Sequence, residues 1–364
     1  MAHSTRQTVL VTGVTGHVGF SVLLNALNAG YNVRATVRSE SKKKVILSHP
    51  HIQYADSGSR LSLIVIPNIA KSHAFDEVAQ GVDYIIHIAS PIATAGSVNP
   101  ADYESHFIRT AVHGTLNVLG AAAKSTTVRR IVLTSSIVAL IPLAQLEGRE
   151  RQSKPVSPSD RVPFPTAPYK DEFEAYAASK IAALSVAEKW VKTRKPRFDV
   201  VYLYPGFVEG RNHLVSNKRD MLKGTNTIVT GIALGNHFGS FIGATVHNED
   251  VATAHIRALD AGVPGNTSYI LSQPSRWNDI KHIAKKHFPG AVASRTLPLT
   301  GSASTLEIEV DTSSTEQVFN FAFKSFEDQV VDVLGHYLEV QHRSKRCNDF
   351  PSMPKAVQQT LQAV

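Results

Sequence analysis

Thr8-Val-Leu-Val-Thr-Gly13-Val-Thr-Gly16-His-Val-Gly19-Phe20 is the stretch that decides the fold of this chain. Its first residues are apolar and β-branched, which predicts a short buried strand over Thr8–Val11. From His17 to Gly30 the apolar residues recur at the spacing of a helix. Three glycines lie between these two patterns. A strand, a glycine-rich turn and a helix in this order predict a unit that binds phosphate groups at the helix N-terminus.

The glycine spacing G-x-x-G-x-x-G gives each glycine a separate task. Gly13 permits the tight turn, Gly16 lets the backbone approach a pyrophosphate, and Gly19 lets helix and strand pack closely. A glycine-rich turn without a ligand is the alternative, because a lone motif of this kind is weak. The place of the motif between a buried strand and an amphipathic helix favours a dinucleotide. The expected cofactor contacts in this turn are Gly13, Thr15, Gly16, His17, Val18 and Gly19.

The second strand indicates which dinucleotide is bound. Asn32–Val37 has the pattern of a strand and is followed directly by Arg38. An acidic residue near this position binds the ribose 2′-hydroxyl of NAD, whereas an arginine accommodates the 2′-phosphate of NADP. Arg38 and the following Lys42 therefore predict NADPH rather than NADH as the cofactor. For the lysines at 42–44, a solvated basic helix start is the alternative.

The composition is that of a globular α/β protein. The chain has 364 residues, of which 43% are hydrophobic and 19% charged, which allows ample buried core. The net charge of +8 raises the question of nucleic-acid binding. The basic residues are scattered and no RNA-binding or zinc-finger motif is present, so we expect no nucleic-acid partner. The 16 histidines form no His-x-x-x-His pair with a matching carboxylate, so we expect no metal.

Features that would send the chain to a membrane or out of the cell are not found in the sequence. No run reaches the roughly 18 apolar residues that a membrane span needs. The N-terminus leads into the first strand without the apolar segment of a secretory signal. Cys347 is the single cysteine, so no disulfide forms within the chain. We therefore expect a cytoplasmic protein without membrane contact.

Strand patterns alternate with helix patterns along the first 205 residues. After the first two strands, further strands are expected at Leu61–Ile66, Asp83–Ile88, Arg130–Thr134 and Val200–Tyr204. Helices are expected between them at Ser72–Gln80, Ala101–Lys124 and Lys170–Arg194. This alternation predicts a mostly parallel sheet in an α/β, Rossmann-type doubly wound fold. Ligands bind at the carboxyl ends of the strands in such sheets.

The chain divides into three parts by composition. Residues 1–205 form the expected dinucleotide-binding domain, with a proline-rich loop at 147–169. Residues 206–341 are expected to form a smaller substrate-binding region that partly returns to the central sheet. Residues 342–364 are polar and basic, which predicts a loosely held tail. Two long helices could form a dimer interface or pack within one chain, so both monomer and homodimer remain open.

Two polar clusters follow strands at the expected ligand edge or lie close to it. Thr134-Ser135-Ser136 ends a buried strand, and Tyr176 and Lys180 stand four residues apart on the next helix, hence on one face. A nearby ammonium favours the phenolate and so lowers the pKa of a tyrosine. Each pattern alone is weak, because hydroxyl-capped turns and Tyr-x-x-x-Lys matches are frequent. Their order after the glycine turn indicates a hydride-transfer enzyme.

This order of motifs resembles the extended short-chain dehydrogenase/reductases. It is most similar to the dihydroflavonol-4-reductase-like group, which includes fungal and yeast aldehyde and ketone reductases and cinnamoyl-CoA reductases. The segments that carry the resemblance include Val11–Gly19, Ala35–Arg38, His87–Pro91, Gly114–Asn117, Val132–Ser136, Tyr176–Lys180 and Asp250–Ala252. The similarity extends from about Thr8 to about Tyr337 and thins over 211–245, where such enzymes differ by substrate.

The resemblance implies a role for each matching residue. Tyr176 protonates the developing alkoxide, Lys180 binds the nicotinamide ribose, and Ser136, rather than Ser135, positions the carbonyl. Asn117 supports a water relay, or is a satisfied polar residue within a buried helix. Further residues are implied to contact the cofactor: Asn68, Ile69, Ala89, Ser90, Pro91, Thr134, Pro205, Gly206 and Val208. The reaction itself is hydride transfer from C4 of the bound nicotinamide to a carbonyl carbon.

Two positions depart from the family pattern. Asn68 stands where the family has an aspartate that contacts the adenine, and its amide oxygen accepts the same hydrogen bond. Arg211 stands where the family often has a proline, and either reaches an anionic substrate or the cofactor pyrophosphate, or is a solvated loop residue.

The resemblance implies an NADPH-dependent ketoreductase or aldehyde reductase for a medium-sized, partly apolar small-molecule carbonyl, in a setting such as polyketide metabolism. Phe207, Phe238 and Phe241 favour such a substrate over a sugar. The alternatives are a nucleotide-sugar epimerase or dehydratase, and a non-catalytic NADP(H)-sensing regulator.

Overall fold

A seven-stranded parallel sheet forms the centre of the molecule in the computed structural model, which describes residues 6–56, 59–93 and 96–349. The strand order is β10-β6-β5-β4-β1-β2-β3, and every neighbouring pair is parallel. The chain moves outward in opposite directions from β1 and β4, which makes this pair the switch point where ligands bind. The strands are β1 (Thr8–Thr12), β2 (Asn32–Val37), β3 (Leu61–Val65), β4 (Tyr84–His87), β5 (Arg130–Thr134), β6 (Asp199–Pro205) and β10 (Thr267–Leu271).

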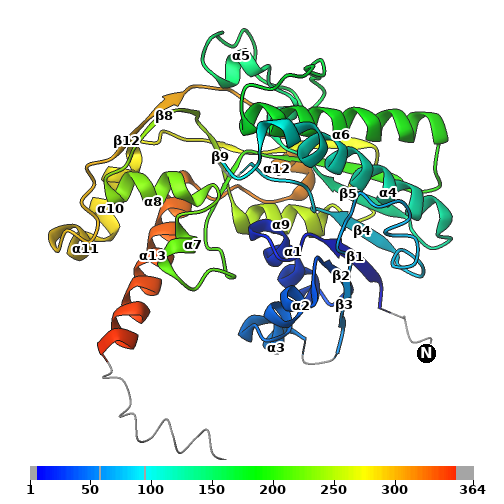
Figure 1. Cartoon of the computed structure of the whole chain (residues 1–364), viewed down its shortest axis with the longest axis horizontal. Helices are drawn as coiled ribbons and strands as arrows, with labels where there is room; N and C mark the ends of the chain where they lie inside the picture. The colour runs from blue at the N-terminus through cyan, green and yellow to red at the C-terminus, as the bar shows by residue number, and fades with distance from the viewer. Residues whose placement is uncertain (1–5, 57–58, 94–95, 350–364) are drawn as a thin grey trace, which may run out of the picture.

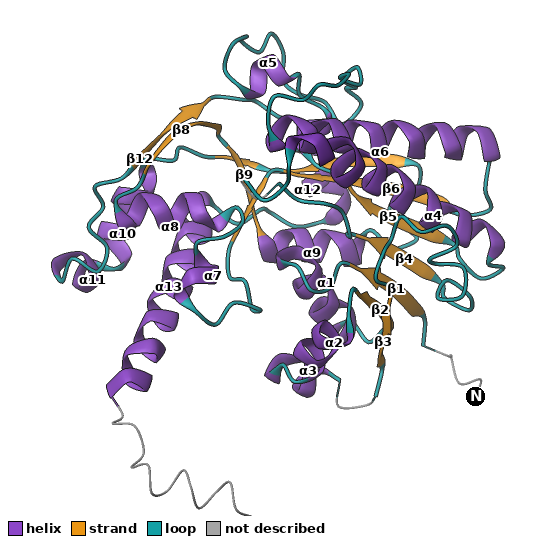
Figure 2. Ribbon diagram, viewed as in Figure 1, coloured by secondary structure: helices purple, strands orange, loops and turns teal. Residues whose placement is uncertain are grey.

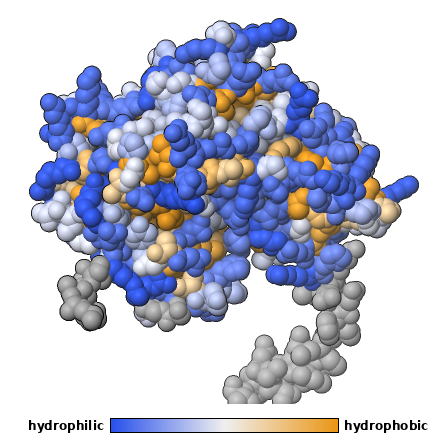
Figure 3. All heavy atoms as spheres, turned by 180° about the vertical axis from the view of Figure 1, so that it is seen from behind, coloured by the Kyte–Doolittle hydropathy of each residue, from blue (hydrophilic) through white to orange (hydrophobic). Residues whose placement is uncertain are grey.

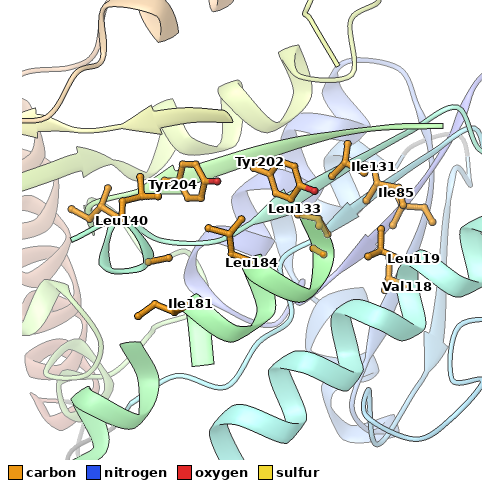
Figure 4. Close-up of a cluster of buried hydrophobic side chains, with 14 of the residues drawn as sticks. Ile85, Val118, Leu119, Ile131, Leu133, Leu140, Ile181, Leu184, Tyr202 and Tyr204 are labelled. Atoms are coloured by element: carbon orange, nitrogen blue, oxygen red, sulfur yellow. The ribbon is translucent and has the colours of Figure 1, made fainter. Parts of the chain in front are cut away.

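Helices cover both faces of this sheet (Figures 1 and 2). On one face, α1 and α9 share a hydrophobic core with the sheet. On the other face, α4 and α6 pack side by side over a second core, in which Leu184 of α6 points toward Tyr202 of β6 (Figure 4). The predicted doubly wound α/β fold is thus confirmed. The helices of this half are α1 (His17–Asn28), α2 (Glu40–Leu47), α3 (Pro50–Ala55), α4 (Thr110–Lys124), α5 (Leu143–Leu146), α6 (Glu172–Arg194), α9 (Asn248–Arg257) and α12 (Ser313–Phe319).

The rest of the chain builds a smaller C-terminal lobe beside the sheet (Figure 1). It contains a three-stranded sheet in the order β11-β9-β7 and a two-stranded sheet of β12 and β8. A third hydrophobic core surrounds the fully buried Trp277. The strands are β7 (Phe207–Glu209), β8 (His237–Ile242), β9 (Ala244–His247), β11 (Gln273–Pro274) and β12 (Ser302–Leu306). The helices are α7 (Lys218–Met221), α8 (Asn226–Leu234), α10 (Asp279–His287), α11 (Pro289–Ala293) and α13 (Phe326–Asp349).

The segment Ser72–Gln80 forms turns where the sequence predicts a helix. Its buried residues Phe75, Val78 and Ala79 have helical spacing, which explains the prediction. The backbone at His73 is left-handed, with φ of 65°, and this conformation interrupts a right-handed helix. Most backbone hydrogen bonds of the segment accordingly join residues three apart.

The C-terminal end of the described chain is helical. α13 continues to Asp349, beyond the expected start of the tail at residue 342, while residues 350–364 lie outside the described part. The helix predicted over Ala101–Lys124 is regular only in α4. A 3-10 turn at Pro100–Asp102 and a π-helical segment at Glu104–Arg109 precede α4, in place of the first turns of the predicted helix.

No helix among the described residues is both long and apolar enough to cross a bilayer. On the face seen in Figure 3, hydrophobic side chains gather in separate patches among hydrophilic ones.

Candidate active site

The glycine turn between β1 and α1 is packed too tightly for side chains at two of its three glycines. Gly13 has φ of +79°, and a Cβ there would lie 2.8 Å from the backbone nitrogen of Ala89. A Cβ on Gly19 would lie 2.0 Å from the carbonyl oxygen of Gly13. At Gly16 the nearest protein atom would be 3.5 Å away, an ordinary contact. The protein itself therefore leaves open the glycine expected to face a pyrophosphate.

The N-terminus of α1 is suited to an anion. Gly16 is its N-cap, and no side chain from the described chain caps the helix or places a negative charge in its first turn. The free N–H groups of that turn and the positive end of the helix dipole favour a phosphate. Thr15 and Val18 are half-buried in this turn. These residues fit the pyrophosphate of a dinucleotide.

The His17 side chain points away from the turn and secures it to the C-terminal lobe. Its Nε2 lies 3.1 Å from the carbonyl oxygen of Gly210 and 3.2 Å from that of Arg211. Burial lowers the pKa of His17 to about 4, so the ring is neutral at physiological pH. A contact of His17 with a dinucleotide would therefore come from its backbone.

Arg38 and Lys42 lie at the carboxyl end of β2, where the sequence places the 2′-phosphate. Both side chains are exposed, and neither forms an ion pair with a described residue. Ser39 caps α2 by accepting a hydrogen bond from the Lys42 backbone N–H at 3.3 Å. The two cations are thus available to an anionic ligand.

Asn68 and Asn117 both form hydrogen bonds with the segment that follows β3. The Asn68 Oδ1 accepts a bond from the Ala70 N–H at 2.9 Å and retains a second lone pair for a ligand. The Asn117 amide donates to the carbonyl oxygens of Ile69 and Lys71, each at 2.9 Å. Asn117 therefore anchors the segment after β3.

Thr12 organises the ends of β1 and β4 at the switch point. Its hydroxyl oxygen accepts hydrogen bonds from the N–H groups of Ile88 and Ala89, at 3.0 and 3.1 Å. It also lies 2.9 Å from Nδ1 of the buried His87. These bonds place the segment Ala89-Ser90-Pro91 beside the glycine turn.

Ser136, Tyr176 and Lys180 are brought to the ends of β5 and β6. Ser136 is buried at the end of β5, with Oγ 3.5 Å from the carbonyl oxygen of Pro205. Tyr176 and Lys180 lie one turn apart on α6, and the Lys180 Nζ lies 5.5 Å from the centre of the Tyr176 ring. The chain positions that the sequence links to proton transfer thus lie at one edge of the sheet.

Burial controls the ionisation of this pair. It raises the pKa of the Tyr176 phenol, while the nearby Ser136 hydroxyl acts in the opposite direction. It also lowers the pKa of Lys180 to about 8. The expected lowering of the tyrosine pKa by Lys180 is not seen, because the ammonium lies over the ring face and desolvation dominates. Tyr176 is consequently protonated at neutral pH and is able to donate a proton.

A cavity of about 30 Å³ lies against Lys180, between the sheet and helices α4 and α6. It brings together four of the predicted residues, namely Ala89, Ser90, Thr134 and Lys180. Ser135, which the sequence offered as the less likely partner of the carbonyl, also lines it, as do His87, Thr115 and Tyr202, which were not among the predicted site residues. His87 is the first residue of the His87–Pro91 segment that carries the family resemblance. Its position just before the ligand-binding end of β4 could have identified it as a site residue.

Other predicted cofactor contacts have clear partners within the protein. The Thr134 hydroxyl lies 2.7 Å from Nε2 of the buried His255 and so faces α9. Gly206 fits where a Cβ would lie 2.5 Å from the carbonyl oxygen of Ala244. Pro205 ends β6, and Val208 is buried in the core shared with α1 and α9.

Arg211 and the aromatic residues of the C-terminal lobe are engaged within that lobe. The Arg211 guanidinium forms two hydrogen bonds of 2.7 Å with Glu339 of α13, so its charge is paired within the lobe. Phe207 and Phe241 pack edge-on against Trp277, with ring centres 5.6 and 6.3 Å away. These phenylalanines thus belong to the core of the lobe.

The chain is similar to known proteins in sequence and in fold. The chain is 39% identical over 348 residues to the ketoreductase CTB6 of Cercospora beticola, covering 93% of this chain and 96% of that protein. It is 31% identical over 358 residues to the NAD-dependent epimerase/dehydratase FUM13 of Gibberella moniliformis, covering 92% and 96%. Yeast methylglyoxal/isovaleraldehyde reductase Gre2, solved with NADPH, shares the fold, with a TM-score of 0.74 at 22% identity over 93% of this chain and all of that one.

These similarities confirm the family resemblance inferred from the motifs. The model of one family matches residues 9–271, which span the central sheet from β1 to β10. The chain belongs to the NAD dependent epimerase/dehydratase family.

Proposed function

We propose that the chain is an NADPH-dependent reductase that converts a ketone or aldehyde of a small molecule into an alcohol. The single observation that carries this proposal is that Ser136, Tyr176 and Lys180 lie together at the carboxyl ends of β5 and β6, with the Tyr176 phenol kept protonated by burial. A bound nicotinamide would supply the hydride. Tyr176 would donate the proton to the developing alkoxide, and Ser136 would hold the carbonyl oxygen.

Lys180 would stabilise the negative charge that forms as the carbonyl is reduced. Its side chain is 7% exposed, so its charge acts in a desolvated environment where electrostatic interactions are strong. Since the pKa of Lys180 is about 8, the side chain carries its charge at neutral pH and loses it as the pH rises through that value.

Arg38 supports NADPH over NADH. The guanidinium is exposed and free of ion pairs in the described chain, at the strand end where a 2′-phosphate is bound. The structure of Gre2 with NADPH shows that a protein of this fold uses that cofactor. An NAD-dependent epimerase or dehydratase is less consistent with an arginine at this position.

A partly apolar substrate is supported by the exposed hydrophobic residues around the site. Ile92 follows the segment Ala89-Ser90-Pro91 and is 65% exposed, while Phe173 lies one helical turn before Tyr176 and is 38% exposed. The similarity to fungal ketoreductases supports a ketone of secondary metabolism, such as a polyketide intermediate.

The test is turnover by the purified protein. NADPH and NADH oxidation would be followed with aromatic aldehydes, β-keto esters and polyketide-like ketones, and with a nucleotide sugar as the comparison substrate. We expect NADPH-dependent reduction that falls roughly 10²–10⁴-fold in Tyr176→Phe, the usual worth of a general acid. The urea midpoint of the variant should match the parent chain. Turnover of the nucleotide sugar alone, or unchanged turnover in Tyr176→Phe, would contradict the proposal.

A further inference from the structure

Lys180 is buried without a countercharge. Its side chain is 7% exposed, desolvation alone accounts for its lowered pKa, and it forms no ion pair with a described residue. A buried ammonium needs hydrogen-bond acceptors, because an unpaired buried charge is costly. The cavity of about 30 Å³ against its side chain exceeds the roughly 10–15 Å³ that one water molecule requires.

One wall of this cavity has a hydrogen-bond donor whose direction is set by the protein. Thr12 Oγ uses both of its lone pairs on the N–H groups of Ile88 and Ala89, so its own proton is donated to Nδ1 of His87. The neutral ring then carries its proton on Nε2. Phe75 packs edge-on against the ring at 6.0 Å and keeps its plane in place. His87 is therefore a fixed N–H donor beside Lys180.

A second polar group that lines the cavity, the Ser135 hydroxyl, has no protein partner among the described residues. Ser135 Oγ is buried and forms no hydrogen bond with any described residue, although Ser135 lines the cavity. Buried hydroxyls without partners are rare in folded proteins, and ordered water is a common reason for them. On α4, the cavity is lined by Thr115 and Ala111, one helical turn apart.

Asn117 does not supply a polar group to this cavity. Both of its amide hydrogens are used by the carbonyl oxygens of Ile69 and Lys71, and it is not among the residues that line the cavity. The water relay that the sequence assigned to Asn117 thus requires other residues.

We propose that His87 and Ser135 hold a water molecule against Lys180, and that this water takes the relay place that the sequence gave to Asn117. The water accepts hydrogen bonds from the Lys180 ammonium and from His87 Nε2–H, and donates one to Ser135 Oγ. Its oxygen is thereby turned toward the ammonium, which favours the charged form of Lys180. His87 and Ser135 are positioning residues, because they act on the reaction only through this water and Lys180.

The inference rests on the proposed function only for its effect on turnover.

The titratable groups that face Lys180 are His87 from β4, Tyr202 from β6 and Tyr176 from α6. The lining residues of α4 and β5 do not titrate. Burial raises the pKa of Tyr202 and of Tyr176 and lowers that of His87 to about 3, so these three are neutral between pH 6 and 9. Lys180 is then the group whose charge changes in this range.

Two substitutions at His87 distinguish the role of Nδ1 from that of Nε2. In His87→Asn, the amide oxygen replaces Nδ1 as the partner of Thr12, but nothing reaches the cavity. In His87→Gln, the longer amide returns an N–H near the position of Nε2. We expect His87→Asn and Ser135→Ala to lower the pKa of Lys180 by about one unit, the worth of one hydrogen bond to a charged group. His87→Gln should stay close to the parent value.

Two readouts test this. Competitive acetylation of Lys180 across pH, measured by peptide mass spectrometry on the protein alone, reports its pKa without turnover. The alkaline limb of the kcat profile should move to lower pH by the same amount in His87→Asn. Equal shifts in His87→Asn and His87→Gln would reduce His87 to a packing role and overturn the proposal. A shift in Asn117→Ala, with none in Ser135→Ala, would return the relay to Asn117. If turnover is not found, the acetylation profile still decides the inference while the proposed function fails separately.

Discussion

Arg38 in the sheet half and Arg211 in the C-terminal lobe are the same residue type in opposite situations. Arg38 is exposed at the end of β2 and has no ion pair in the described chain. Arg211 donates its backbone N–H to Asp332 at 2.6 Å and its guanidinium to Glu339. In the sheet half, Arg38 is left without an ion pair at the carboxyl end of a strand, where an anionic ligand can bind it. In the lobe, Arg211 is paired with acidic residues of α13.

The buried polar atoms show the same difference in another form. The side chains of Lys180 and Ser135 face a cavity in the sheet half, and neither forms a hydrogen bond or ion pair with a described residue. In the lobe, the Trp277 Nε1 and the Glu209 carboxyl are buried without partners in the described chain. Burial holds the pKa of Glu209 well above its usual range. Substitutions should therefore affect catalysis in the sheet half and stability in the lobe.

The largest effect is expected from the core of the lobe. Trp277 is fully buried, and its ring contacts Phe207 and Phe326 edge-on. Trp277→Ala should lower the free energy of unfolding by about 3–5 kcal/mol, the usual cost of removing a buried aromatic ring. Urea denaturation measures this loss. Trp277→Phe is the matched control and should cost less, because it fills most of the space and removes the unpaired N–H. A cost below about 1 kcal/mol for Trp277→Ala would contradict an independent core.

An intermediate effect is expected at Arg38. Arg38→Ala should raise the KM for NADPH roughly 10–100-fold, because charge-assisted hydrogen bonds are worth about 1.5–3 kcal/mol. The KM for NADH and the urea midpoint should stay near their parent values. Steady-state kinetics with both cofactors tests this. An equal rise in the KM for NADPH and for NADH would show that Arg38 does not bind the 2′-phosphate.

The smallest effect is expected at Arg211. This side chain is 30% exposed and Glu339 is 48% exposed, so solvent screens the pair. Arg211→Ala should lower the free energy of unfolding by less than about 1 kcal/mol and leave the KM for NADPH unchanged. Denaturation and kinetics on one preparation give both values. A large rise in the KM for NADPH would show that Arg211 leaves Glu339 to meet the cofactor, and would end the contrast with Arg38.

The sequence predicted the parts of the molecule that depend on local patterns. All six predicted strands of the central sheet occur within about one residue of their expected bounds, because short apolar β-branched runs mark buried parallel strands. The helix expected at Ser72–Gln80 was wrong, since its apolar spacing is that of a helix but a left-handed residue interrupts it. The hydrogen bonds of Asn117 could not be predicted from a local sequence pattern either. Its partners at Ile69 and Lys71 are far away in the chain.

By itself, the sequence determined the positions of the strands in the first half, the glycine turn, and the spacing that places Tyr176 and Lys180 on one helix face. These follow from backbone sterics and side-chain periodicity, which act over a few residues. Only the tertiary structure decided which polar groups are left free. Arg38 and Arg211, or Asn117 and Ser135, differ because of partners that approach from distant segments. Hydrogen bonds and ion pairs require contact within a few ångströms, and such contact between distant segments exists only once the chain has folded.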